Sequence, residues 1–253
     1  YNVKVISADR TNTTEVKVLV KYVKTEKILI FNKEYTAYDT TPTLTTSSNN
    51  TNDLNGLYKS TATNTGDATY YFRGNVEDNY VSFAGTTWRI VRVNEDGTIR
   101  MIMQDGINNN TTYAFNATNY FGYAYMYYSN SSAKTTLENW YNTNIGNKEE
   151  YSKYVVTGDY YCEQAKVKYP TSYGTGNEPM VAYSNYTSDF KCKTDKNGKG
   201  IISSSVGLIT YEEANFSGLY PYDKTGTSYL PFTNTSWTMS PSSTYLKAYD
   251  ASA

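Results

Sequence analysis

The chain of 253 residues contains no histidine and only two cysteines. Histidine is the usual nitrogen ligand of zinc and a common axial ligand of haem, so its absence argues against both kinds of site. A Ser-His-Asp or Cys-His catalytic arrangement is excluded for the same reason. Two cysteines make one pair and no metal cage. We therefore expect no metal site and no cofactor.

The chain also lacks a large net charge, because 23 basic residues and 24 acidic ones leave a formal net charge of −1. Without an evident basic face, nucleic acid and anionic membranes are poor partners. No run approaches the roughly 20 apolar residues of a membrane span, so we expect no membrane insertion. No leader is visible, and the start at Tyr1–Val5 has a strand-like pattern typical of a mature or trimmed product.

Tyrosine is abundant, with 29 copies in a chain that is 39% hydrophobic. A tyrosine can bury its ring and keep its hydroxyl in water, which suits sheets with one solvated face. This composition is typical of secreted β-rich proteins and favours a disulfide between Cys162 and Cys192. Such a bond would stabilise the fold by about 3–4 kcal/mol on the loop-entropy argument. Two buried free thiols in a reducing cell are the alternative.

Residues 1–39 are predicted to form strands. Alternation places four residues on one face of a strand: Val16, Val18, Val20 and Tyr22. The run 27–31, which contains Ile28 and Ile30, is apolar throughout and is predicted to be buried on both faces. Residues 40–56 are rich in Ser, Thr and Asn and are predicted to be a linker or exposed loop, followed by a second unit over 57–253.

Two arms of alternating residues flank Asp96-Gly97 and predict a β-hairpin over 87–103, because glycine tolerates the positive φ of such turns. Short strands are expected at 69–73 and 80–84. In the hairpin we expect Trp88, Ile90 and Val91 in the core. Three residues are expected to face outward: Arg89, Arg92 and Arg100.

A helix is predicted over 133–145, capped by Ser131 or Ser132 and ended by Gly146. A late strand is expected over 205–210, leading into a short helix over 211–214 capped by Thr210. The fold class is therefore β-rich α+β with one or two short helices.

Several segments, in this order, resemble a large group of Firmicutes surface proteins over about residues 57–250: 70–76, 79–85, 88–94, 96–100, 122–127, 137–141, 206–214 and 232–242. Members of that group look like C-type-lectin-like folds of the formylglycine-generating-enzyme kind. The resemblance implies display outside the cell, often on prepilin-like chains, and implies no activity. In the group the chain continues into two further strands that end near an Arg-Pro pair, so we expect those C-terminal strands to be missing here.

Candidate catalytic carboxylates are few. Glu212-Glu213 and Glu149-Glu150 are adjacent, so their side chains point apart, and we predict that both pairs are solvated. Residues 195–200 offer oxygen ligands at two places of a calcium loop, but Lys199 occupies the fifth place, and a tight turn is predicted instead. We expect no enzyme, because no set of residues meets the geometric requirements of a catalytic site.

The sequence favours a structural subunit of an extracellular or cell-surface assembly such as a filament, pilus-like fibre or coat. Residues 1–39 would dock on an adjacent copy or another surface protein through their strands. The alternative is an adhesin or receptor-recognition module that binds a glycan or a host or cell-surface protein. Its candidate contacts, for which core packing is the competing interpretation, are Tyr220, Tyr222, Tyr229, Trp237 and Tyr245.

Overall fold

The computed structural model describes residues 2–9, 17–42, 55–108, 111–116, 127–164, 167–168, 180–183, 189–195, 198–218, 228–230, 239 and 243–245. Within these ranges the protein is rich in strands, with a few short helices. This content confirms the expected β-rich α+β class.

The largest sheet has seven strands in the order β3-β4-β5-β6-β8-β7, with β9 also paired to β8. The strands are β3 (Thr25–Ile30), β4 (Lys33–Tyr38), β5 (Gly56–Ser60), β6 (Thr69–Arg73), β7 (Tyr80–Phe83), β8 (Thr86–Val93) and β9 (Ile99–Met103). All neighbours are antiparallel except β4 and β5, which are parallel. The sheet therefore joins strands from both sides of the segment predicted to be a linker.

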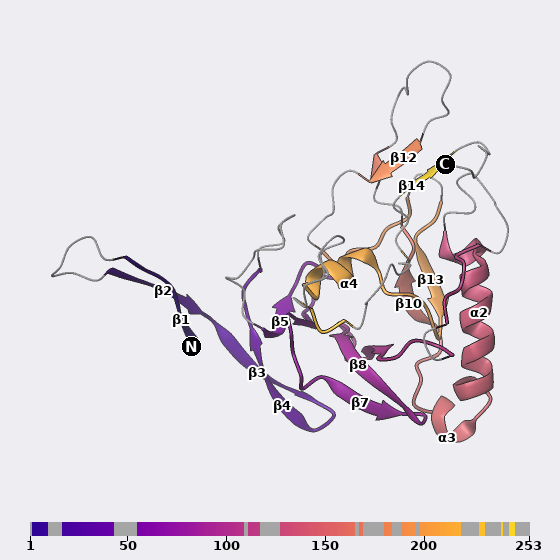
Figure 1. The fold of residues 1–253 in the computed structure, drawn as a ribbon, viewed down its shortest axis with the longest axis horizontal. Coiled ribbons are helices and arrows are strands. Elements are labelled where there is room, and N and C mark those ends of the chain that lie inside the picture. The colour runs from indigo at the N-terminus through magenta and orange to yellow at the C-terminus, as the bar shows by residue number, and fades with distance from the viewer. Residues whose placement is uncertain are drawn as a thin grey trace, which may run out of the picture.

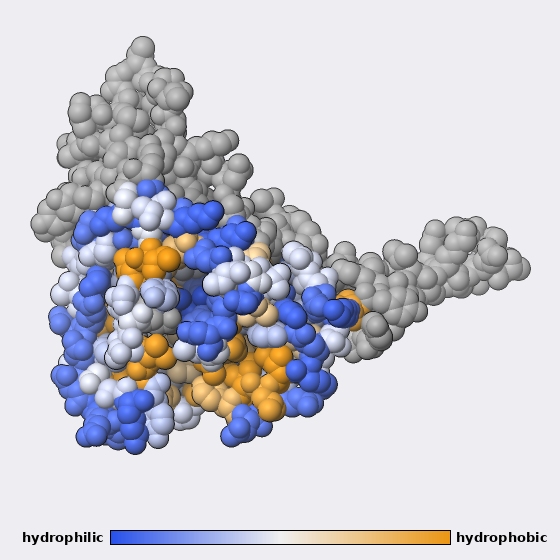
Figure 2. All heavy atoms as spheres, turned by 180° about the vertical axis from the view of Figure 1, so that it is seen from behind, coloured by the Kyte–Doolittle hydropathy of each residue, from blue (hydrophilic) through white to orange (hydrophobic). Residues whose placement is uncertain are grey.

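The core lies on both faces of this sheet, because the paired residues Leu57 and Phe72 are buried in one cluster and their neighbours Tyr58 and Tyr71 in another. Ala37, Leu57, Phe72 and Ile90 are at most 2% exposed, and Ala214 of the helix α4 (Tyr211–Phe216) packs in the same cluster. A second, aromatic cluster joins Tyr58 and Tyr71 of the sheet to Phe216. Seen from behind, apolar residues also gather in the lower half of the molecule (Figure 2). The tyrosines therefore contribute core as well as surface.

The apolar run 27–31 is not buried on both faces. Ile30 is 2% exposed, whereas Leu29 is 72% exposed and Phe31 is 60% exposed. The reason is that β3 is an edge strand whose residues alternate between the core and the other face of the sheet. Phe31 and Asn32 form the turn to β4 with φ of 49° and 64°, the left-handed pair that a two-residue hairpin requires.

The predicted hairpin is confirmed as β8 and β9, but its arginines do not face outward. Arg89 is 4% and Arg100 8% exposed, and the Arg92 side chain is 11% exposed. Ile90 pairs with Met101 and Arg92 with Arg100, so Val91 is an extra, bulged residue. The bulge breaks simple alternation.

The predicted helix over 133–145 is confirmed as α2 (Ser132–Tyr141), which continues into a π-helical turn η2 (Asn142–Gly146). Ser131 caps it, accepting a hydrogen bond from the backbone N–H of Lys134. A single 3-10 turn η1 (Tyr128–Asn130) precedes it and α3 (Glu149–Ser152) follows.

The strand predicted over 205–210 is wrong. The strand in this region is β13 (Ile201–Ser204), which pairs with β10 (Asp159–Cys162), and residues 205–210 lead without strand structure into α4. Gly207 explains part of the difference, since a Cβ there would lie 2.7 Å from the Tyr161 ring and from Met239. Close packing of backbone on side chains replaces strand pairing at this point.

The first two strands, β1 (Asn2–Asp9) and β2 (Lys17–Val23), form a two-stranded sheet of their own, which we name the arm. Figure 1 shows the arm extending away from the rest of the protein, with α2 on the opposite side. A further small sheet joins β11 (Val167–Lys168), β12 (Met180–Tyr183) and β14 (Ser243–Tyr245). Within the described ranges no helix has the length and apolar character to cross a membrane.

Candidate functional site

Three charged side chains converge where α4 meets the β8–β9 hairpin. The Glu213 carboxylate Oε1 lies 2.9 Å from Arg100 Nε and 3.7 Å from Arg92 Nε. Glu212 and Glu213 are 5% and 4% exposed, so the prediction that this pair is solvated is wrong. The two glutamates were expected to be exposed because they are charged, but the arginines compensate the buried charge of Glu213.

A capping box fixes the position of Glu213. The Thr210 hydroxyl accepts a hydrogen bond from the Glu213 N–H at 3.1 Å, and Glu213 Oε2 accepts one from the Thr210 N–H at 3.0 Å. The cap therefore occupies one carboxylate oxygen and leaves the other for the arginines. Arg92 and Arg100 lie directly opposite each other on β8 and β9, where like charges repel unless an anion lies between them.

The environment sets the protonation state of Glu213. Burial alone would raise the pKa of its carboxyl group, but Arg100, Arg92 and the hydrogen bonds from Thr210 together hold the pKa below its usual value. The carboxylate is therefore ionised at neutral pH and engaged by donors on both oxygens. It serves as a fixed negative charge and not as a proton donor.

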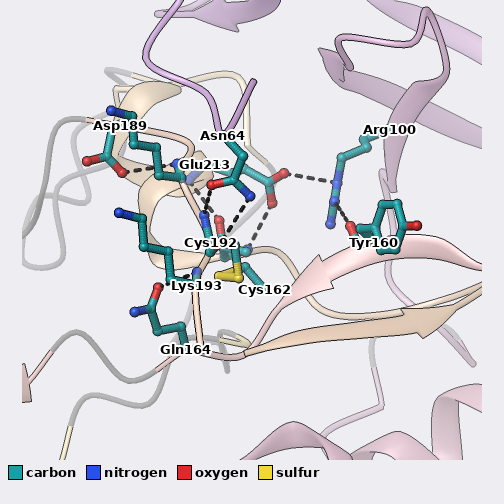
Figure 3. Close-up of a disulfide and its surroundings, with 11 residues drawn as sticks. Asn64, Arg100, Tyr160, Cys162, Gln164, Asp189, Cys192, Lys193 and Glu213 are labelled. Carbon is teal, nitrogen blue, oxygen red and sulfur yellow. Dashed lines mark hydrogen bonds and ion pairs between the residues drawn. A yellow bond between two sulfur atoms is a disulfide. The ribbon is translucent and has the colours of Figure 1, made fainter. Parts of the chain in front are cut away.

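The confirmed disulfide lies beside this triad. Cys162 and Cys192 are bonded, with Cα atoms 5.7 Å apart, so the alternative of two free thiols is wrong. The Asn64 side chain donates to the Cys192 carbonyl and accepts from its N–H, both at 2.9 Å, and so clamps this backbone against the main sheet. Figure 3 shows Glu213, Arg100 and Tyr160 close to the disulfide.

Opposite the triad of Glu213, Arg92 and Arg100 lies the β10–β13 pair, whose surface is partly apolar. In the β10–β13 pair, Tyr160 lies opposite Ser203 and Cys162 opposite Ile201, so Tyr160 and Ile201 share one face. Tyr160 is 68% exposed and Ile201 is 49% exposed. Arg100 Nη1 donates to the Tyr160 carbonyl at 2.7 Å and so joins the β10–β13 pair to the charged triad.

Together these walls enclose a space of about 310 Å³, which we name the cleft. Five carboxylates line it against three cations: Glu95, Asp96, Asp189, Glu212 and Glu213 against Arg92, Arg100 and Lys191. Asn94 also lines the cleft, and its Oδ1 is buried with no hydrogen-bond partner among the described residues. Ionisable groups from separate parts of the chain therefore converge in the cleft.

The cleft offers charged and hydrogen-bonding groups to a ligand. Its deepest carboxylate is neutralised by guanidinium groups, and within the described ranges no cluster of His, Cys, Asp and Glu has the makings of a metal site. An excess of acidic groups, a buried amide oxygen without a donor and an exposed tyrosine suit a cationic or hydroxyl-bearing ligand.

Among the residues predicted to contact a ligand, only Tyr229 has a described side chain. Tyr229 is 4% exposed and belongs to the core, which matches the packing interpretation. Tyr220, Tyr222 and Trp237 lie outside the described residues, and Tyr245 lies in β14. Among the described residues, polar groups converge in the cleft.

The predicted tight turn after Asp195 is confirmed, because the Asp195 N–H donates to the Lys199 carbonyl at 2.6 Å. The Asp195 side chain accepts from the Lys199 N–H and from the Tyr127 hydroxyl at 3.0 and 2.8 Å. These donors occupy the carboxylate that a calcium ion would need.

The predicted assembly residues divide between the arm and the core. Val18, Val20 and Tyr22 lie in β2, Val16 lies outside the described residues, and Ile28 is half-buried in β3. Ile30 packs in the core of its own subunit, so it is not available to a neighbour.

The register of the arm extends the predicted apolar stripe to both strands. Val3 lies opposite Tyr22 and Val5 opposite Val20, so these positions share a face. A bulge between Val5 and Ser7 then brings Ala8 opposite Val18, which keeps the stripe apolar. The other face carries the directly opposed pair Lys4 and Lys21.

Comparison of the chain with protein-family models, with curated proteins and with solved structures finds no match.

Proposed function

We propose that this chain is a structural subunit of an extracellular bacterial surface assembly, such as a filament, pilus-like fibre or coat. The arm is the observation that carries the proposal, because its two strands pair with each other and, among the described residues, with no third strand. A two-stranded sheet alone is only marginally stable in water. Docking on a neighbouring subunit supplies the missing stabilisation.

The apolar face of the arm supports the same function. Three cross-strand pairs lie on it: Val3 with Tyr22, Val5 with Val20, and Ala8 with Val18. An element with one apolar face is stable when that face is buried against another element. Figure 1 shows the arm extending from the body, so a second molecule is the natural cover.

The described chain outside the arm, which we name the body, fits an extracellular role. The disulfide between Cys162 and Cys192 is a bond that persists in oxidising compartments and is rare in the cytosol. The resemblance over about 57–250 supports display outside the cell and a C-type-lectin-like fold for this part of the chain. In this proposal the body is the displayed unit and the arm is its connector.

The test replaces the opposed pair in the apolar face by charges, as Val5→Lys with Val20→Lys. We expect wild-type protein to associate as its concentration rises, and the double variant to stay monomeric in light scattering and to form no fibres by electron microscopy. The matched control is Thr135→Lys with Asn139→Lys on the exposed face of α2, which leaves association unchanged. Wild-type protein that stays monomeric at its highest soluble concentration contradicts the proposal.

The cleft favours a second candidate function, recognition of a glycan or a cell-surface protein by an adhesin. Its exposed Tyr160 and its acidic lining are suited to hydroxyl groups and to a sugar face. A glycan array with wild-type protein and the variant Tyr160→Ala tests this function, with Tyr154→Ala as control, since Tyr154 is 71% exposed and does not line the cleft. A blank array for the wild type argues against it.

A further inference from the structure

We infer that the arm of one copy docks on the cleft of a second copy, an inference that rests on the proposed function. The arm has basic strands, and the cleft has an acidic lining. Each copy then carries one donor surface and one acceptor surface.

Charge is the first match between the two surfaces. The described strands of the arm carry Lys4, Lys17 and Lys21 against Asp9 alone. Lys4 and Lys21 lie directly opposite each other, and like charges at opposed positions destabilise a strand pair. An acidic surface on the second copy relieves the repulsion between Lys4 and Lys21.

The cleft supplies such an acceptor. The Glu213 charge is already balanced by Arg92 and Arg100, but acidic groups still outnumber cations in the lining. Glu95 and Asp96 stand at the turn of the β8–β9 hairpin. A basic strand pair brought to this rim meets charge of the opposite sign, which steers association and selects the partner.

Size is the second match. A cleft of about 310 Å³ admits a few side chains and not a whole hairpin. The arm therefore presents one face to the cleft. That face is the one of Lys4 and Lys21, and the Val5–Val20 face lies on the other side of the strand pair.

The placement of the two surfaces favours contact between copies. Figure 1 shows the arm extending away from β10 and β13, so the arm and the cleft of one molecule lie far apart. A contact between two different patches is heterologous and does not close on itself unless the rotation makes a ring. Arm-to-cleft docking therefore produces a linear, head-to-tail assembly of subunits.

The test is complementation between two charge variants, Lys21→Glu in the arm and Glu95→Lys in the cleft. Each variant alone brings one pair of like charges together at every arm-to-cleft contact, and we expect its association to be at least about tenfold weaker than that of wild type in sedimentation velocity. An equimolar mixture of the two restores association, because the native arm of one meets the native cleft of the other and the reversed surfaces also match. Glu77→Lys, an equal charge change at an exposed position that does not line the cleft, leaves association unchanged.

The outcomes separate the two proposals. If Glu95→Lys associates like wild type while Val5→Lys with Val20→Lys does not, the arm docks elsewhere, and the inference fails while the proposed function stands. A mixture that does not regain association also overturns it. If neither the wild type nor any mixture associates, the proposed function and this inference fail together.

Discussion

Replacing Glu213 by glutamine should be among the most damaging conservative substitutions in the described part of the protein. Glutamine keeps the shape of the side chain and can still accept the hydrogen bond from the Thr210 N–H, so the helix cap is retained. The charge between Arg92 and Arg100 is lost, so two guanidinium groups that are at most 11% exposed lose the carboxylate that neutralises them. Removing one partner of such a buried pair costs about 3–5 kcal/mol.

The dependence of this loss on pH provides a second readout. The pKa of Glu213 is lowered from its usual value of 4.5, so the folded protein binds this proton less well than the unfolded chain. The stability that the charge contributes is therefore fully present above pH 4.5 and is lost as the pH falls through the lower folded pKa. The difference between wild type and Glu213→Gln must shrink on acidification.

The assay is urea unfolding followed by tryptophan fluorescence, at neutral pH and at a series of lower pH values. Glu26→Gln is the matched control, because Glu26 also lies 2.9 Å from a cation but its side chain is 31% exposed, and such pairs contribute about 0–1 kcal/mol. Adding Arg92→Met and Arg100→Met to Glu213→Gln should recover part of the stability, since the uncompensated charges disappear. A loss below about 1 kcal/mol for Glu213→Gln, or a loss that does not change with pH, would refute the reasoning.

Three further outcomes are expected from the same unfolding assay. Replacing Cys162 and Cys192 by serine should lower the free energy of unfolding by about 3–4 kcal/mol, and reductant should then have no further effect; a wild type insensitive to reductant would count against it. Phe31→Gly should raise stability by up to about 1 kcal/mol, because Phe31 has φ of 49° and an L-residue is strained there; a decrease would show that the exposed ring makes a contact worth more. Thr210→Ala should cost about 1 kcal/mol through loss of the cap, and no change in the urea midpoint would contradict the role of the capping box.

Local features of the fold could be predicted from the sequence because their causes are local. The Asp96-Gly97 turn, the Ser131 cap of α2 and the Thr210 cap of α4 each depend on residues a few positions apart, and all three form as expected. The disulfide followed from the number of cysteines and an extracellular composition. These signals need no knowledge of which segments meet in space.

The buried triad of Glu213, Arg92 and Arg100 in the cleft could not be predicted in the same way. Their charge favoured an outward direction for Arg92 and Arg100, and the Val91 bulge that changes the facing of this strand has no local sequence signal. The capping-box spacing predicted the local position of Glu213, but its counter-ions come from a distant hairpin. A buried charge is recognisable only when its partner is known. The exposed Leu29 was missed because a short apolar run does not reveal that its strand lies at an edge.

The clamp of Asn64 on the Cys192 backbone gives the segment around Cys192 a second, non-covalent attachment. Both of its hydrogen bonds span 128 residues of sequence, so they join this segment to the loop that carries Asn64. The disulfide joins the same segment to Cys162 at the end of β10. Reduction of the disulfide therefore removes one of these attachments, and the hydrogen bonds from Asn64 remain to hold the segment in place.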